Sequence, residues 1–432
     1  MTELDFALSQ RLLERVGAAG FDAAEVLLTQ RKVTEMQIDA GDISLLRDTE
    51  NIALTLRGIA GGRYATVHLN QLDDDSVRVG VEQLQQAAQA APVDPARAFA
   101  PPQAIEAHDE GPAQAALAPM HARVEGFATA MRQRFPDVKL EQAMLQFERT
   151  RQLRANTLGL RLDTRQAGYD AQAMFSAERG AKRSSFNYGG GSARDLDRAL
   201  FDWGGLGRLI ESSSREVEHV AFDGKFVGSL VLTPECVFSL LDPWLAHLSD
   251  ERLVAGTSRL RESIGKPVCS PLLTLRIDPE APQFARREFT TGDGYRSMPS
   301  TLIDAGVLRS FMLSDYGARK TGLPRAVNGA RHRIVEPGTT LLAALIEAVP
   351  KGLLMGRFSG GGPAANGDFS GVAKNSYLIE GGRVGPPVSE VMVSGNLFEM
   401  MHAIRAVSLE TVNDGNTSVP WIRVDGITVA GK

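Results

Sequence analysis

The sequence predicts an α+β protein built from antiparallel sheets and a few helices. Apolar residues alternate with polar ones along several segments, a pattern typical of strands with one buried face. Pairs of glycines separate those segments, and other stretches carry apolar residues at every third or fourth position, as helices require. A chain of 432 residues exceeds the size at which a single core stops growing, so more than one domain is expected.

Residues 1–91 are predicted to form an N-terminal α/β domain with an antiparallel sheet. The domain opens with a helix, because apolar residues recur every fourth position from Leu8 to Val16. Alternating stretches follow, and Gly61-Gly62 is predicted to reverse the chain between two of them. The acidic run 73–76 supplies side chains that cap a helix N-terminus, so a second helix is expected to start there.

Residues 92–119 are predicted to be a linker rich in proline and alanine. Six of the 21 prolines of the chain fall in these 28 positions. Proline removes a backbone donor and blocks regular structure, so a domain boundary is expected in this segment.

Residues 120–220 are predicted to form a central region of one helix and an antiparallel sheet, and residues 221–432 a mostly β domain. Alternation is clearest at 169–175 in the central region. The C-terminal part has many short alternating segments separated by turn residues, which predicts a barrel-like or sandwich-like sheet. Helical insertions are expected at 234–248 and 341–348.

Composition and charge exclude several classes of protein. With 43% hydrophobic and 23% charged residues, the chain is neither wholly disordered nor collagen-like. A net charge of −5 with no basic patch predicts no nucleic-acid partner. Charges interrupt the N-terminus, and no uncharged run reaches the roughly 18 residues of a membrane helix, so a cytoplasmic protein without membrane association is expected. Cys236 and Cys269 are expected to be buried, reduced thiols.

Few stretches of the sequence carry a known chemical motif. The G-x-S-x-G, phosphate-loop and H-E-x-x-H patterns are missing from the sequence. The nearest approach to a metal site is Asp242 and His247, with Glu251 one helical turn further on; a solvated or capping His–Glu pair is the alternative interpretation. The glycine-rich stretch 359–371 is either an irregular loop or exposed backbone that docks an extended peptide.

A series of short motifs resembles one known family. The motifs are 22–26, 156–159, 258–260, 265–268, 316–322, 366–373, 377–382, 388–390, 394–397 and 426–432. Together they are similar to the TldD/TldE metalloprotease family, whose members are also called PmbA or modulator of DNA gyrase proteins. The resemblance extends over essentially the whole chain, and its C-terminal motifs are the most specific.

The family has two branches, and this sequence resembles the TldE/PmbA branch. In the TldD branch a helix carries H-E-x-x-x-H, and a later cysteine completes the zinc site. The best fit here places Asp242 at the first histidine and Pro243 at the catalytic glutamate, so only His247 is retained. No cysteine follows Cys269. The resemblance therefore implies no catalytic residue and no metal ligand set in this chain, and it implies zinc in a TldD-type partner.

The resemblance also implies a function and a set of partners. Family members of the two branches are thought to form a heteromer that encloses a cavity in which short or unfolded peptides are cut. This chain would be the non-catalytic subunit beside a TldD-like catalytic subunit, and a homodimer when alone. The residues nominated for peptide docking are Asp368, Phe369, Ser370, Gly395 and Asn396. Roles in turns and packing are the alternative interpretation for each.

Two other functions stay open from the sequence. One is a regulatory protein-binding module, a gyrase modulator as the older family name suggests. The other is a stand-alone metallopeptidase whose non-standard metal site would use Asp242, His247 and Glu251.

Overall fold

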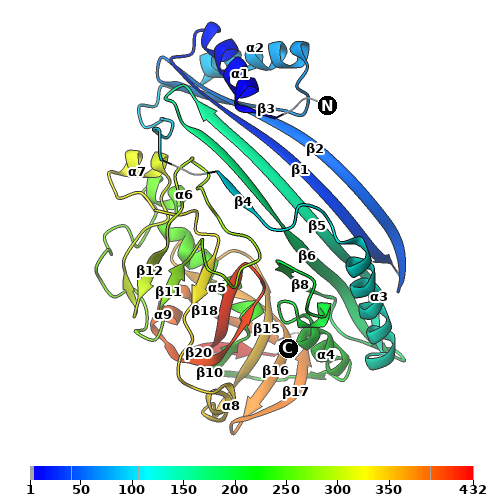
Figure 1. Ribbon diagram of the computed structural model, residues 1–432. Coiled ribbons are helices and arrows are strands. Elements are labelled where there is room, and N and C mark those ends of the chain that lie inside the picture. The colour runs from blue at the N-terminus through cyan, green and yellow to red at the C-terminus, as the bar shows by residue number, and fades with distance from the viewer. Residues whose placement is uncertain (1–3, 40, 105–106, 390, 432) are drawn as a thin grey trace.

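The computed structural model describes residues 4–39, 41–104, 107–389 and 391–431, and it confirms the predicted α+β fold. A curved antiparallel sheet forms one side of the molecule, and a mostly β C-terminal body lies against the inner side of its curve (Figure 1). Within the described residues, no helix is both long and apolar enough to cross a membrane.

The curved sheet has eight strands in the order β3-β2-β1-β5-β6-β4, with β7 and β8 also paired to β6. Their bounds are β1 Ala23–Asp39, β2 Asp42–Ala60, β3 Arg63–Leu69, β4 His108–Glu110, β5 Val138–Asn156, β6 Arg161–Arg179, β7 Lys182–Arg183 and β8 Asn187–Ala193. The four long strands form because alternation continues without a proline or glycine break through most of their length.

Helices cover the outer face of this sheet. They are α1 Phe6–Ala18, α2 Asp74–Ala90 and α3 Leu117–Arg134 (Figure 1). Ala24, Val26 and Leu28 of β1 pack into the core beneath α1 and α2, and Met36 and Ile38 of the same strand face pack beneath α3.

The predicted starts of the first two helices are confirmed by their caps. The Asp5 carboxylate accepts a hydrogen bond from the Leu8 main-chain N–H at 2.6 Å. In the acidic run, the Asp73 carboxylate accepts one from the Ser76 N–H at 2.9 Å, which satisfies a donor that the helix leaves free.

The segment predicted to be a linker is part of the folded structure: it pairs with the curved sheet and contributes buried side chains. Strand β4 lies within it and pairs in parallel with β6, and Phe99 and Ala100 are buried. Strand β1 pairs with β5 along its length, so one sheet continues from the first predicted unit into the central one. The domain boundaries at 91, 119 and 220 remain a prediction.

The C-terminal body contains a closed ring of strands, as predicted for its barrel-like pattern. Strand β10 pairs with β15, β15 with β16, β16 with β18, β18 with β20, and β20 with β10 again. The strand bounds are β9 Val220–Ala221, β10 Lys225–Leu232, β11 Leu275–Ile277, β12 Ser300–Asp304, β13 Val307–Leu308, β14 Arg333–Val335, β15 Lys351–Gly360, β16 Asp368–Glu380, β17 Arg383–Ser389, β18 Val391–Asn396, β19 Ile404–Asn413 and β20 Thr417–Ala430.

Short helices pack on and between these strands. They are η1 Leu200–Asp202, α4 Leu206–Glu216, α5 Pro234–Leu245, η2 Ala246–Leu248, α6 Asp250–Val254, α7 Asp315–Thr321, α8 Leu342–Glu347 and α9 Leu397–His402. Helix α5 is a core element, because Cys236, Leu240 and Trp244 have no exposed surface and belong to the largest apolar cluster. Helix α4 lies between the curved sheet and strands β16 and β17.

Candidate functional site

The helix that carries the degenerate motif is engaged in structural contacts. Asp242 pairs with Arg333 of β14, and the guanidinium of Arg333 lies 3.9 Å from the centre of the Phe238 ring. Pro243 sits inside α5 and has no titratable group. Asp242 is therefore engaged in a contact with β14, and Pro243 offers no acid–base group.

His247, the retained histidine of the motif, is a core residue. Only 4% of its surface is exposed, and its ring meets Phe398 edge-on with centroids 5.1 Å apart. Its Nδ1 atom accepts a hydrogen bond from the Arg259 main-chain N–H at 3.1 Å. Burial, with the nearby charges of Arg252 and Arg259, lowers the pKa of His247 to about 4. The imidazole is therefore neutral at pH 7.

The residues near this motif do not fit a zinc site. Glu251 lies exposed in α6, and the described residues contain no group of three or more His, Cys, Asp or Glu side chains placed to hold a metal ion. Cys236 and Cys269 are buried and free, and burial raises the pKa of each thiol to about 12. Neither thiol is available as the thiolate that a metal requires.

The five residues nominated for peptide docking come together on two paired strands. Asp368 lies opposite Asn396 and Phe369 opposite Gly395 in the β16–β18 pair, with Ser370 next along β16. The register of the two strands therefore brings the five residues side by side.

The contacts of this cluster are those of a turn and a helix cap. The Asn396 side chain accepts a hydrogen bond from the Phe398 N–H at 3.0 Å and donates one to Asp368 Oδ1 at 2.9 Å. Phe369 is 4% exposed, and its ring meets that of Phe358 at 5.9 Å in the core. Arg259, whose N–H reaches His247, also donates to the Asn366 carbonyl at 2.5 Å. A peptide-binding role for the cluster remains a prediction.

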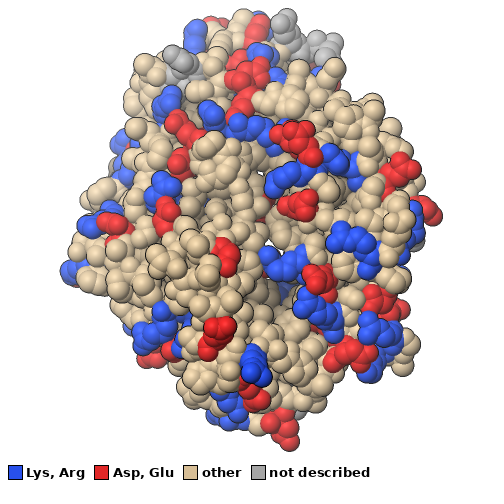
Figure 2. Space-filling view, turned by 60° about the horizontal axis from the view of Figure 1, so that its bottom comes forward, with Lys and Arg blue, Asp and Glu red and all other residues tan. Residues whose placement is uncertain are grey.

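A cavity that the sequence did not predict lies between the curved sheet and the C-terminal body. Its volume is about 770 Å³. The lining comes from β5, β6, β8, α4, α5, β15, β16 and the loop before β20. The face drawn in Figure 2 is hollowed near its centre, and its basic and acidic side chains are interspersed. The cavity wall joins residues as far apart in the sequence as Met144 and Asp414, which are 270 positions apart, and local patterns therefore did not predict it.

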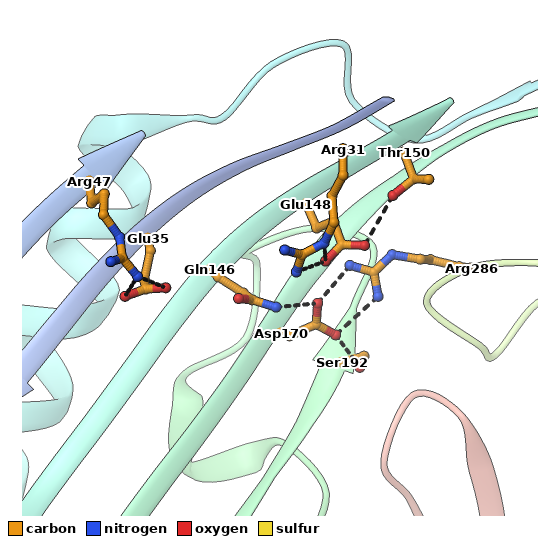
Figure 3. A network of polar contacts seen from close by, with 9 residues as sticks. All are labelled: Arg31, Glu35, Arg47, Gln146, Glu148, Thr150, Asp170, Ser192 and Arg286. Atoms are coloured by element: carbon orange, nitrogen blue, oxygen red, sulfur yellow. Dashed lines mark hydrogen bonds and ion pairs between the residues drawn. The ribbon is translucent and has the colours of Figure 1, made fainter. Parts of the chain in front are cut away.

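One wall of this cavity carries a partly buried ion pair that joins the two bodies. Arg286 of the C-terminal body donates to both carboxylate oxygens of Asp170 on β6, at 3.0 and 2.7 Å (Figure 3). Ser192 of β8 donates to the same carboxylate at 2.6 Å, and Gln146 of β5 at 3.4 Å. Burial alone would raise the pKa of Asp170, but Arg286 and Ser192 hold it below its usual value.

Further charges on the inner face of the sheet are paired across strands. Arg31 on β1 donates to Glu148 on β5 at 2.9 Å, and Arg47 on β2 donates to Glu35 on β1 at 3.2 Å (Figure 3). The inner face is thus polar with its charges largely compensated, whereas the outer face is apolar beneath its helices. Such a surface can hydrogen-bond an uncharged polar ligand without selecting strongly for one sign of charge.

Two of the three glycines of β8, Gly190 and Gly191, are needed for the close approach that shapes the cavity. A Cβ atom on Gly190 would lie 1.9 Å from the Ala171 carbonyl oxygen, and one on Gly191 would lie 2.8 Å from the Asp414 carbonyl oxygen. Only glycine fits at such distances. The run Gly189-Gly190-Gly191 was the one visible indication of this site in the sequence.

The sequence of this chain is similar to the sequences of metalloproteases. Residues 226–431 match the model of the PmbA/TldA metallopeptidase C-terminal domain. A metalloprotease PmbA homologue of Haemophilus influenzae is 25% identical over 200 residues, 45% of this chain and 44% of that protein. A metalloprotease TldD homologue from the same organism is 29% identical over 196 residues, 39% of this chain and 40% of that protein. These matches span less than half the length of either relative.

Solved structures share the fold over the full length. TldE from Thermococcus kodakarensis superposes with a TM-score of 0.84 at 19% identity, covering 98% of this chain and 100% of that one. A Bacteroides thetaiotaomicron protein described as a candidate modulator of DNA gyrase gives a TM-score of 0.85 at 22% identity, with 100% of both chains covered. At these identities the likeness establishes the fold.

Proposed function

Because this chain belongs to the PmbA/TldD metallopeptidase family, we propose that it is the non-catalytic subunit of a TldD/TldE-type complex that cleaves short or unfolded peptides. The observation that carries this proposal is the set of contacts made by the residues at the C-terminal end of α5. Asp242 is held by Arg333, His247 is buried with Nδ1 already bonded, and Pro243 stands where the family resemblance places the general base.

Hydrolysis of a peptide bond by a metallopeptidase needs two things that these positions do not supply. A catalytic zinc normally takes three protein ligands and keeps one position for water, and a carboxylate then removes a proton from that water. General-base catalysis contributes about 10²–10⁴-fold to such a rate. A TldD-like partner would supply both the zinc and the base.

The contribution of this chain would be the polar surface that meets the peptide. The 770 Å³ cavity and the inner face of the sheet offer hydrogen-bonding groups with compensated charges, such as the Asp170–Arg286 and Arg31–Glu148 pairs. An extended peptide presents the same N–H and C=O groups whatever its sequence, so it can bind such a surface through its main chain. A folded protein has those groups already paired, and this difference would favour unfolded substrates.

Reconstitution with a TldD-like chain from the same genome tests the proposal. The chain alone should leave an unfolded fluorogenic peptide intact, and it should form a homodimer in sedimentation experiments. Addition of the TldD-like chain should give cleavage well above that of either chain alone, and a zinc chelator should stop it. Chelator-sensitive cleavage by this chain alone, abolished by His247→Ala, would show that the chain is itself the enzyme.

A further inference from the structure

Three side chains with oxygen atoms join helix α4 to strand β16 of the C-terminal body. Glu216 is the last residue of α4, Ser212 lies one turn before it, and Tyr377 lies on β16. The Ser212 Oγ atom is 2.9 Å from Glu216 Oε1 and 2.9 Å from Tyr377 Oη. Tyr377 Oη is also 3.2 Å from the main-chain carbonyl oxygen of Ser212.

The hydrogen atoms available to this network decide which form of Glu216 it fits. Three contacts between oxygen atoms need three hydrogens, and the hydroxyls of Ser212 and Tyr377 supply two. An ionised carboxylate supplies none, so one contact would then bring two oxygens together without a hydrogen. A protonated Glu216 donates to Ser212, Ser212 donates to Tyr377, and Tyr377 donates to the Ser212 carbonyl. The network is therefore complete only when Glu216 carries a proton.

The surroundings of Glu216 also oppose its ionisation. The residue is 5% exposed, and no Lys or Arg in the described part of the chain forms an ion pair with it. It lies at the C-terminal end of α4, where the helix dipole disfavours a negative charge. Burial raises the pKa of Glu216 to about 7. Hydrogen bonds from Ser212 and Asn187 and the charge of Arg357 oppose this shift but do not outweigh it.

The other titratable groups near Glu216 make their contacts elsewhere. Arg183, His219 and Lys374 line a cavity of about 290 Å³ together with Glu216. Arg183 pairs with Glu178, and His219 Nδ1 lies 3.1 Å from the main-chain carbonyl oxygen of Glu216, away from its carboxyl group. Among the described residues, none of these groups is in direct contact with the Glu216 carboxyl, so none neutralises its charge.

Helix α4 forms part of the boundary between the two bodies. It packs against β6 and β8 of the curved sheet and against β16 and β17 of the C-terminal body (Figure 1). Leu209 of α4 and Asn187 of β8 line the 770 Å³ cavity, and Asn187 also donates a hydrogen bond to Ser213 of α4. A change in how α4 is held therefore changes one wall of that cavity.

We propose that Glu216 is a proton-dependent latch between α4 and β16. With its proton, the network of Glu216, Ser212 and Tyr377 is complete and fixes α4 to the C-terminal body. Loss of the proton as pH rises leaves an unpaired charge at the end of α4 and breaks one contact of the network. Helix α4 then opens more often, and the cavity loses a fixed wall. This pH response belongs to the fold itself and does not depend on what the cavity binds.

Hydrogen exchange of the full chain, followed by mass spectrometry at pH 5 and pH 8, tests the latch. Exchange rates are divided by the intrinsic rate at each pH, so that only the opening of the structure is compared. Protection of α4 should fall at least about tenfold at pH 8, because the closed state binds a proton that the open state has lost. Helix α1, which packs at the other end of the curved sheet, is the internal reference and should keep its protection.

Glu216→Gln identifies the group that carries the proton. Its amide donates to Ser212 at any pH, so α4 should stay protected at both pH values. Glu211→Gln changes a carboxylate on the same helix that is 56% exposed, and His219→Gln removes the neighbouring imidazole. Both controls should keep the loss of protection seen in the wild type. Tyr377→Phe removes the hydroxyl on the strand and should lower the protection of α4 at pH 5 about three- to tenfold.

Three results would overturn the latch. The first is equal protection of α4 at pH 5 and pH 8 in the wild type, a comparison that needs no variant to fold. The second is a loss of protection that persists in Glu216→Gln, and the third is a loss that His219→Gln abolishes. Either of the last two would assign the proton to another group. None of the three bears on peptide cleavage by the complex, which is measured separately.

Discussion

The inner face of the curved sheet and the motif helix α5 use their polar side chains in opposite ways. On the sheet, Asp170 lines the 770 Å³ cavity and is paired with Arg286, and Arg31 is paired with Glu148 on the same inner face. At the end of α5, Asp242 is bound to a strand and His247 is buried in the core. The difference agrees with the proposed non-catalytic role: the inner face of the sheet is an open polar surface, whereas Asp242 and His247 make contacts within the C-terminal body.

Replacement of Trp244 by alanine should have the largest effect on stability, and it tests whether α5 is a structural element. Trp244 in α5 has no exposed surface, so its truncation should lower the free energy of unfolding by about 3–5 kcal/mol, as for other large buried side chains. Urea unfolding followed by circular dichroism measures the change. Leu341→Ala, at a position 55% exposed, is the control and should change the stability by less than about 0.5 kcal/mol. A small effect of Trp244→Ala would contradict a structural role for α5.

Glu216, where α4 meets the body of the molecule, should make stability fall as pH rises. Burial raises the pKa of Glu216 to about 7, so the folded state keeps a proton that the unfolded state loses above pH 4.5. This contribution is complete below pH 4.5 and disappears as pH rises through 7. Glu216→Gln should therefore match the wild type at pH 4.5 and exceed it by about 2–3 kcal/mol at pH 8.

Chemical denaturation at several pH values measures the effect of Glu216→Gln. Glu211→Gln changes a carboxylate on the same helix that is 56% exposed and paired with Arg215, and it should keep the pH profile of the wild type. If Glu216→Gln also kept that profile, Glu216 would be ionised in the fold.

His247 should make stability fall as pH falls, in the opposite direction to Glu216 and over almost the same pH range. Its pKa of about 4 in the fold lies below the usual 6.5, so the unfolded state takes up a proton first as pH falls. Its contribution is complete above pH 6.5 and is lost as pH falls through 4. His247→Gln should remove this loss and gain about 2 kcal/mol relative to the wild type between pH 7 and pH 4.

The control for His247→Gln is His121→Gln, since His121 is 57% exposed on α3. That variant should follow the wild-type profile. An unchanged profile for His247→Gln would mean that the imidazole reaches solvent and can be protonated, which would reopen a functional role for it.

The sequence predicted the elements whose patterns are local. The helix that begins at the acidic cap Asp73 and the barrel-like C-terminal sheet follow from capping and alternation. Strand β5 was missed, because Arg149 and Arg151 interrupt its apolar face. The structure explains both: they lie between the areas covered by α3 and α1, and they pair with Asp109 and Asp163.

The candidate site was predicted only where its residues are close in sequence or lie on a recognisable motif. Strand register brings Asp368 and Asn396 together and turns Phe369 into the core, and one residue of slippage would reverse that orientation. The 770 Å³ cavity depends on contacts between strands that are distant in the sequence, which local patterns do not reveal.

Asp242→Asn is the variant of smallest expected effect, and it separates a structural carboxylate from a metal ligand. The Asp242 side chain is 49% exposed and paired with Arg333, so loss of its charge should lower the free energy of unfolding by less than about 1 kcal/mol. Asp304→Asn breaks a pair with Arg309 in which Asp304 is 51% exposed, and it should show the same small loss. Zinc titrated into each protein and followed by calorimetry is the decisive measurement. A ligand at position 242 would make binding weaker in Asp242→Asn alone, whereas a carboxylate that serves only the Arg333 contact leaves the wild type and both variants with the same zinc response.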